Sequence, residues 1–555
     1  MSGRRFAAIC TSVIAVLAAL VSLSYWIAHS DDGWALEEPA RLLPGIGSLH
    51  HPISTRSAEA QRFFDQGLTL VYGFDFDAAV RSFRRAAEID PHSAMPHWGI
   101  ALARGPNYNS VAPSPLYEHL AYQEVQVAVK LSAEAAAGEQ AYINALAKRY
   151  TDAARPDLGR LERDYADAMR DVSNSFPDDP DAPVLYAGSL MDLHPWQLWT
   201  NDGQPGENTA EIVQVLERVI ERWPEHVGAN HYYLHAMEAS PVPERALYAA
   251  RRLESLVTSC SHLIHMPAHI YFRSGDYSAA VRTSQQAIAV DDLHQGQNGG
   301  EVEGGQYEHQ HQSYSGYMQH NVLFLIASAM MDGEKEVAYK AVKHLTSTSR
   351  SQLYQAVAIL APLRFGEWED VIETAPPEES DSEARLFWHY SRGCAFAAMH
   401  QSREAELERD EMENTYRYVP PGRAFGAFFN DWASLHTIAL EVLDARIDLS
   451  RHKARSAIRR WQHAVVLEDQ LAFDDLPDWY YPVRESLGAA LFQTGAFAEA
   501  EQVFRDDLKR TRSNPRSLFG LWKSLQVQSK FAAAAQIRRT FEATWKGSEL
   551  RIEDL

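Results

Sequence analysis

The chain is poor in cysteine. Its 555 residues include three, Cys10, Cys260 and Cys394. Three thiols can build neither a disulfide framework nor a zinc cage made of thiolates. Any metal that this chain binds must therefore be held mainly by histidine and carboxylate side chains, and the 23 histidines are the main supply.

Basic charge is also scarce. The chain has 52 lysines and arginines against 74 acidic residues, a formal net charge of -22, and no basic block. We therefore expect no nucleic acid among its partners, and an acidic surface does not suit anionic lipid either. The 30 glycines and 26 prolines are too few for a fibrous or low-complexity chain, and 46% hydrophobic residues predict a folded protein with a large core.

One long apolar run stands at the N-terminus. It covers residues 6–27 and follows Arg4 and Arg5. At about 1.5 Å per residue it is long enough for a hydrocarbon core of about 30 Å. The two arginines predict a cytoplasmic N-terminus. Residues 1–30 are thus predicted to be an uncleaved inner-membrane anchor with the rest of the chain exported to the periplasmic side. The alternative is a signal peptide cleaved near residues 28–30, which leaves a soluble periplasmic protein. The membrane is expected to be reached only through this helix.

The remainder of the chain carries a helical repeat. The segment FFDQGLTLVYGFDFDAAVRSFRRAAEIDP places Gly67, Ala79, Phe83, Ala86 and Pro91 at consensus positions of the 34-residue tetratricopeptide (TPR) repeat. The alanine at repeat position 20 recurs as Ala246, Ala280, Ala338, Ala405, Ala500 and Ala534. These matches predict an all-α fold: a TPR α-solenoid, a right-handed superhelix of helix-turn-helix repeats, over residues 59–555. Residues 31–58 are predicted to be a linker, and almost no sheet is expected.

The sequence also predicts where the repeats turn and where they are interrupted. Glycine-led turns at 275–277, 366–368 and 495–497 are expected between the two helices of a repeat. Two stretches, 193–209 and 291–319, depart from the repeat and are predicted to be irregular insertions. Loops of this kind often lie over binding sites. A disordered surface insertion is the alternative for 291–319.

Histidines gather in one part of the chain: residues 231–320 hold nine of the 23. His231, His235 and Glu238 are spaced i, i+4, i+7, and His262, His265 and His269 are spaced i, i+3, i+7, so each set shares one helix face. His320 begins a third helix. The repeat register places these residues on the first helix of each repeat, on the face that lines the concave groove. We therefore predict a metal site in the groove, formed by these six residues and His320.

The number and type of these side chains limit the metal. Five histidines and one carboxylate exceed a four-coordinate site, so two metals, or one metal with supporting partners, could use them. Imidazole-rich ligation suits copper, zinc or iron; copper or iron would permit oxygen chemistry, and zinc would permit hydrolysis. Cys260 is a weak candidate ligand, and Met266 is interpreted as a packing residue. The alternative is a ladder of hydrogen-bonded imidazoles, or a groove that contacts an acidic peptide.

Other polar and aromatic residues are weaker candidates for binding a substrate. They are His97, Asn107, Tyr108, His194, Trp479, Tyr481 and Arg484. Aromatic rings with one arginine, as in DLPDWYYPVRESLGAALF, suit an organic anion. Packing between repeats is the alternative for these residues.

The chain also resembles a group of bacterial exported TPR proteins. The resemblance rests on HHPISTRSAEAQRFFDQGL, GANHYYLHAMEASPVPERAL, HLIHMPAHIYFRSGDY, QHNVLF and DWYYPVRESLGAALF, and covers the chain from about residue 50 to its end. It implies the solenoid fold and marks His231, His235, Glu238, His262, His265, His269 and His320 as signature polar residues of the group. It implies no particular reaction. His97 and His194 depart from the residues expected at their positions.

Three functions remain open from these observations. The first is a metalloenzyme whose groove takes a small-molecule or peptide ligand. The second is a scaffold whose concave surface binds a peptide or a partner protein, as solenoids commonly do. The third is metal storage, delivery or sensing without turnover. The placement of the histidines favours the first.

Overall fold

A computed structural model describes residues 40–109, 115–298, 314–348, 352–425 and 430–555. Contacts divide the chain into the units Met1–Leu42 and Leu43–Leu555, and the fold below is that of the second unit. The predicted anchor, residues 1–30, lies outside the described residues. Within the described part, no helix combines the length and the apolar character needed to cross a bilayer.

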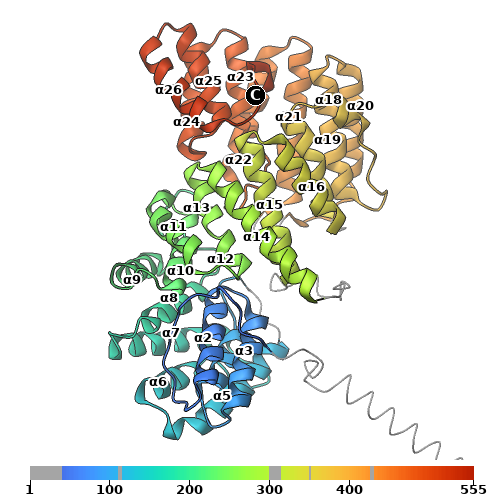
Figure 1. Ribbon diagram of the computed structural model, residues 1–555. Helices are drawn as coiled ribbons and strands as arrows, with labels where there is room; N and C mark the ends of the chain where they lie inside the picture. Colours follow the sequence, from blue (N-terminus) through green and yellow to red (C-terminus); the bar gives the residue numbers. More distant parts are fainter. Residues whose placement is uncertain (1–39, 110–114, 299–313, 349–351, 426–429) are drawn as a thin grey trace, which may run out of the picture. The chain divides into compact units, whose positions relative to one another are not determined.

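Helices dominate the described chain (Figure 1). The first half contains α2 (Ala58–Tyr72), α3 (Phe76–Ile89), α4 (Met95–Arg104), α5 (Pro115–Leu131), η1 (Ser132–Glu134), α6 (Ala137–Leu146), α7 (Leu158–Ser175), α8 (Asp181–Asp192), α9 (Thr209–Arg222), α10 (Val227–Glu238), η2 (Pro243–Ala246), α11 (Leu247–Leu256), α12 (Ser261–His265), α13 (Pro267–Ser274) and α14 (Tyr277–Asn298).

The second half contains α15 (Tyr314–Asp332), α16 (Lys335–Thr348), α17 (Gln352–Arg364), α18 (Trp368–Glu373), α19 (Ser382–Ala398), α20 (Ser402–Tyr416), α21 (Trp432–Ser450), α22 (Ala454–Gln470), α23 (Val483–Gln493), α24 (Phe497–Arg510), α25 (Pro515–Val527), α26 (Phe531–Thr544) and η3 (Ile552–Asp554). The described sheet is limited to β1 (Ala424–Phe425) paired antiparallel with β2 (Asn430–Asp431). The predicted all-α solenoid is confirmed.

The repeat consensus explains how neighbouring helices pack. The alanine at position 20 is the fourth residue of the second helix in α3, α14, α16, α20, α24 and α26, and it is buried in each. Four residues later, Phe83 fills the space left by Gly67 in α2 and Gly99 in α4. A Cβ atom at either glycine would lie 2.6 Å from the Phe83 ring, so a larger residue there would force the helices apart.

The turn between the two helices of a repeat uses a left-handed backbone. Gly275, Gly366 and Gly495 have φ of 81°, 71° and 81°, as their predicted role in turns requires. Phe74 stands at the same place, two residues before α3, with φ of 55°. A bulky side chain rarely adopts this conformation, so the surrounding structure must hold it there.

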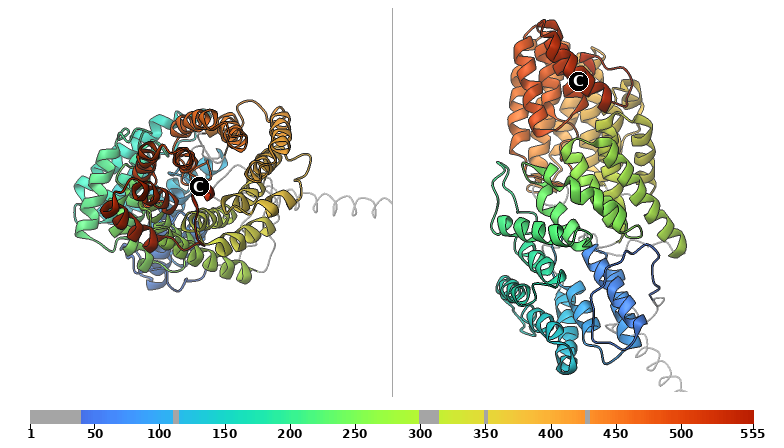
Figure 2. Two further views of the ribbon diagram at one scale, coloured as in Figure 1. Left: turned by 90° about the horizontal axis from the view of Figure 1, so that it is seen from above. Right: turned by 60° about the vertical axis from the view of Figure 1, so that its left-hand side comes forward.

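The solenoid winds so that distant repeats touch. Tyr277 donates a hydrogen bond to the carbonyl of Arg512, 235 residues away, and Arg512 donates to the carbonyl of Pro241. In two views the segment α10–α14, drawn in green, lies between the blue helices and the red helices (Figures 1 and 2). Most of the histidine-bearing helices therefore lie between repeats from the two ends of the chain.

The two predicted insertions have different structures. Residues 193–208 run as turns, with a bridge between Trp199 and Pro205. Residues 291–319 were expected to be irregular throughout, and this boundary is wrong. Helix α14 continues to Asn298 and α15 begins at Tyr314, so both ends of the stretch are helical; residues 299–313 lie outside the described part.

Candidate metal centre

Four neighbouring helices carry the predicted ligands and bury most of them. His231 and His235 lie on α10, His262 and His265 on α12, His269 on α13, and His320 on α15. The first five are 0–5% exposed. The side chains therefore form a buried polar cluster.

The imidazoles divide into two sets of three. His231, His235 and His262 form one set, called triad A here, and His265, His269 and His320 form triad B. In each set one candidate ligand atom per residue lies within 4.8 Å of the others. The division runs through α12, because His262 belongs to triad A whereas His265, three residues later, joins His269 of α13 in triad B.

In triad A a hydrogen bond at the outer nitrogen fixes the orientation of the His231 ring. The Nδ1 of His231 lies 2.5 Å from the carbonyl oxygen of Tyr72, which can only accept, so Nδ1 donates and Nε2 keeps its lone pair. That Nε2 is 3.1 Å from the Nε2 of His262. The Nε2 of His235 is buried and has no hydrogen-bond partner.

Triad B repeats this arrangement. The Nε2 atoms of His265 and His269 lie 2.9 Å apart, and those of His269 and His320 lie 3.4 Å apart. Two nitrogens bound tetrahedrally to one ion at about 2.0–2.1 Å are about 3.3 Å apart. One nitrogen pair of triad A and two of triad B are already close to that spacing, and the remaining pairs lie within 4.8 Å.

Glu238 joins the two triads. Its Oε1 accepts a hydrogen bond from Nδ1 of His235 at 2.8 Å, and its Oε2 accepts one from Nδ1 of His269 at 2.5 Å. Both oxygens of this predicted ligand are thus engaged with imidazoles. The bonds direct Nε2 of one histidine in each triad inward, as carboxylates behind metal-binding histidines commonly do.

Each triad rests against one phenylalanine. The Phe74 ring contacts His231, His235 and His262 with ring centroids 4.7–5.5 Å apart. The Phe324 ring contacts His265, His269 and His320 at 4.3–5.0 Å. The triads are neighbours, because the His235 and His269 rings are 6.2 Å apart. The sequence prediction missed both phenylalanines. The available signal was Phe74, which stands at the turn position where other repeats carry glycine.

Burial controls the charge of these groups. Desolvation lowers the pKa of His231, His262 and His265 well below the usual value, and that of His269 is also lowered. Burial alone would raise the pKa of Glu238, but His235 and His269 hold it at about 2. For His231, His262, His265 and His269 burial therefore favours the neutral imidazole, the form that metal binding requires.

A cavity of about 380 Å³ adjoins both triads. His235 and His262 of triad A and His269 and His320 of triad B form part of its wall. Trp479 and Tyr481, two of the predicted substrate-binding residues, also line it. They belong to the segment 471–482 between α22 and α23.

The same segment brings carboxylates that the sequence prediction missed. Asp475 lies with Oδ2 3.8 Å from Nε2 of His320 and Oδ1 3.7 Å from Nδ1 of His269. With Glu238 and His269 it forms a further group of metal-ligating atoms. No local signal marks Asp475, because it reaches the histidines through the winding of the solenoid.

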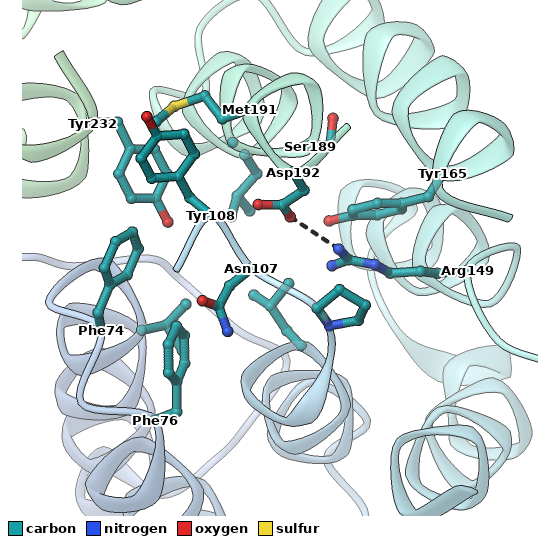
Figure 3. Close-up of a pocket in the computed structure, with 15 residues that line it drawn as sticks. Phe74, Phe76, Asn107, Tyr108, Arg149, Tyr165, Ser189, Met191, Asp192 and Tyr232 are labelled. Carbon is teal, nitrogen blue, oxygen red and sulfur yellow. Dashed lines mark hydrogen bonds and ion pairs between the residues drawn. The ribbon is translucent and has the colours of Figure 1, made fainter. Parts of the chain in front are cut away.

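Tyr108 and Asn107 lie behind triad A. The Tyr108 ring packs between Trp196 of the 193–208 segment and His235, at 5.1 and 5.3 Å. Both predicted residues line a small separate cavity of about 40 Å³, in which Asp192 and Arg149 are hydrogen-bonded at 2.9 Å (Figure 3). The 193–208 segment thus packs against the candidate metal centre.

The remaining candidates lie elsewhere. His97 is paired with Glu124, His194 with Glu207, and Arg484 with Asp469, and none of the three lines either cavity. Cys260 packs against Gly73, and burial raises the pKa of its thiol to about 12, which opposes the thiolate form that binds metals. Met266 is fully buried, in line with the packing role predicted for it.

Comparisons with known proteins give structural neighbours only. No family model and no curated protein matches the chain. Among solved structures, human IFIT1 in a dimer with m7Gppp-AAAA is 12% identical, with 85% of this chain and 94% of that chain covered and a TM-score of 0.33. The Cut9-Hcn1 hetero-tetramer of APC/C is 13% identical, with 96% of this chain and 80% of that chain covered and a TM-score of 0.28. Likeness at this level says nothing about the ligands of this chain.

Proposed function

We propose that this protein is a metalloenzyme that holds two transition-metal ions, one in each histidine triad, and acts on an organic molecule bound in the adjoining cavity. The observation that carries the proposal is the pair of three-imidazole sets, with five of the six rings buried, linked by Glu238. A surface that binds a peptide has no need of five histidines that are 0–5% exposed.

Copper, zinc and iron fit this donor set. All-imidazole ligation suits these ions better than magnesium or calcium. Three protein ligands also leave an open coordination position for water or substrate, as in catalytic rather than structural sites. Oxidative chemistry follows if the ions are copper or iron, and hydrolysis by an activated water follows if they are zinc.

Elemental analysis of the full chain, purified without a histidine tag, tests the proposal. We expect two metal ions per chain. His262→Ala should remove the ion of triad A and His265→Ala the ion of triad B, while His97→Ala, which alters a histidine outside the centre, should keep both. A folded chain that binds no copper, zinc or iron, or a His97→Ala variant that loses as much metal as the other two, contradicts the proposal and favours a scaffold.

A further inference from the structure

Carboxyl groups without a cationic partner face the cavity beside the metal centre. Asp474, Asp475 and Asp478 line it, and no lysine or arginine is among the described residues that do. Asp474 accepts a hydrogen bond from the backbone N–H of Asp475 at 2.8 Å, and Asp478 accepts one from the Asn430 side chain at 2.6 Å. These neutral donors leave the negative charge of the group uncompensated.

Metal ions in the triads do not account for all three carboxyls. Only Asp475 belongs to a group of side chains that could hold a metal. Asp474 and Asp478 belong to no such group among the described residues, and the cavity wall places no basic side chain beside them. This part of the cavity therefore suits a cation.

The rest of the wall is apolar. Leu323, Ile326 and Met330 of α15 face the cavity, together with Leu360 of α17 and Phe387 of α19. Leu360 is 6% exposed and Phe387 is 1% exposed. A ligand with a hydrocarbon body would remove this surface from water at a gain of about 25 cal/mol per Å².

A second feature, independent of the metal centre, points to a ligand in this cavity. Trp479 is 2% exposed, lines the cavity, and has a buried Nε1 without a hydrogen-bond partner. Buried polar atoms are rarely left unsatisfied unless they serve a function. Cation-attracting, apolar and metal-binding walls thus enclose one space.

We propose that the cavity binds an organic cation, an amine or alkylammonium compound, with its nitrogen beside Asp474, Asp475 and Asp478 and its hydrocarbon part against α15, α17 and α19. This names the substrate class of the metal centre and rests on the function proposed above. The carboxylates offset the cost of removing the cation from water.

Calorimetric titration of the full chain, with metal content measured on the same sample, tests this. The probes are phenethylamine, phenethyltrimethylammonium and phenethyl alcohol. The quaternary cation has no nitrogen lone pair and cannot ligate a metal. We expect both cations to bind at least about tenfold more tightly than the alcohol. The inference is wrong if the alcohol equals the quaternary cation, if only the amine binds tightly, which indicates metal ligation, or if no probe binds.

Variants separate this inference from the proposed function. Asp474→Asn with Asp478→Asn should abolish the preference for cations and leave the metal content unchanged. Asp152→Asn with Asp171→Asn, two exposed positions, makes the same change in net charge and should keep the preference. A chain that binds metal but shows no cation preference overturns this inference alone, whereas a metal-free folded chain overturns the proposed function. The probe series on the unaltered chain remains decisive if the double variant fails to fold.

Discussion

Glu238 has an unusual position among the buried carboxylates of this chain. It is 1% exposed and accepts a hydrogen bond from one histidine of each triad. Two imidazole N–H donors compensate the cost of burying its charge, so its pKa stays near 2 despite desolvation. One side chain thereby sets the direction in which two ligand nitrogens point.

Glu238→Gln tests that role. The amide keeps the shape but has one acceptor oxygen, so one of the two histidines loses the bond that fixes its tautomer. We expect metal affinity to fall by about 10–100-fold, as for other partners behind metal ligands, with helix content preserved. Metal titration of the purified chain measures the effect. Glu221→Gln, at an exposed position, is the matched control; equal affinities in the two variants would contradict the assignment.

At the scale of the elements, the short turns within repeats matter as much as the helices. The residue two before the second helix of a repeat has positive φ at Phe74, Gly275, His400, Gly495 and Ser529. Where it is glycine, the conformation is accessible at little cost. At Phe74 the same backbone aims an aromatic ring into triad A, so a strained turn positions part of the metal centre.

Two glycine substitutions separate strain from function. Ser529→Gly should stabilise the fold by about 1 kcal/mol, since it removes the left-handed penalty. Phe74→Gly removes the same penalty but also deletes a ring that is 3% exposed, so we expect net destabilisation of about 2 kcal/mol and weaker metal binding at triad A. Thermal unfolding followed by circular dichroism, together with metal titration, reports both. A Phe74→Gly chain that is more stable than the parent and binds metal normally would refute this account.

At the scale of the whole molecule, contacts between segments far apart in the sequence support the centre. Asp181, at the start of α8, accepts hydrogen bonds from His51 at 2.8 Å, Tyr72 at 2.6 Å and His226 at 3.1 Å. The Tyr72 carbonyl in turn accepts from His231. The Asp181 cluster therefore connects the segment before α2 with α2, α8 and α10, and supports triad A from behind.

Asp181→Asn should lower stability in a pH-dependent way. Burial would raise the pKa of Asp181, but the hydrogen bonds from His226 and His51 hold it well below the usual value. The contribution of Asp181 to the free energy of unfolding is thus present above about pH 4 and is lost as the pH falls through the folded pKa. The pKa of His51 is raised because the attraction of Asp181 outweighs burial. The contribution of His51 is therefore present below about pH 6.5 and is lost at higher pH.

We therefore expect Asp181→Asn to cost about 3 kcal/mol between pH 4 and pH 6.5. The difference from the parent chain should shrink below pH 4. Urea unfolding at a series of pH values measures it, with Asp152→Asn as the exposed control. A difference that stays constant down to pH 2 would show that the carboxylate charge is not the stabilising feature.

The sequence by itself determined the local features. The position-20 alanines, the glycine-led turns and the placement of His231 with His235 on one helix face follow from spacings of a few residues, and helical periodicity converts such spacings directly into geometry. The prediction that copper, zinc or iron suits these ligands depends on residue type alone, and remains a prediction.

Only the tertiary structure decided how the ligands combine. The sequence grouped His262 with His265 and His269 by spacing, whereas the fold places His262 beside His231 and His235 in triad A and the other two beside His320 in triad B. Asp475 lies more than 200 residues from His269 in the chain but 3.7 Å away in space. Which distant residues meet depends on the small rotation between successive repeats, which accumulates along the solenoid. No local pattern in the sequence gives that accumulated rotation, so only the fold revealed the buried centre and its cavity.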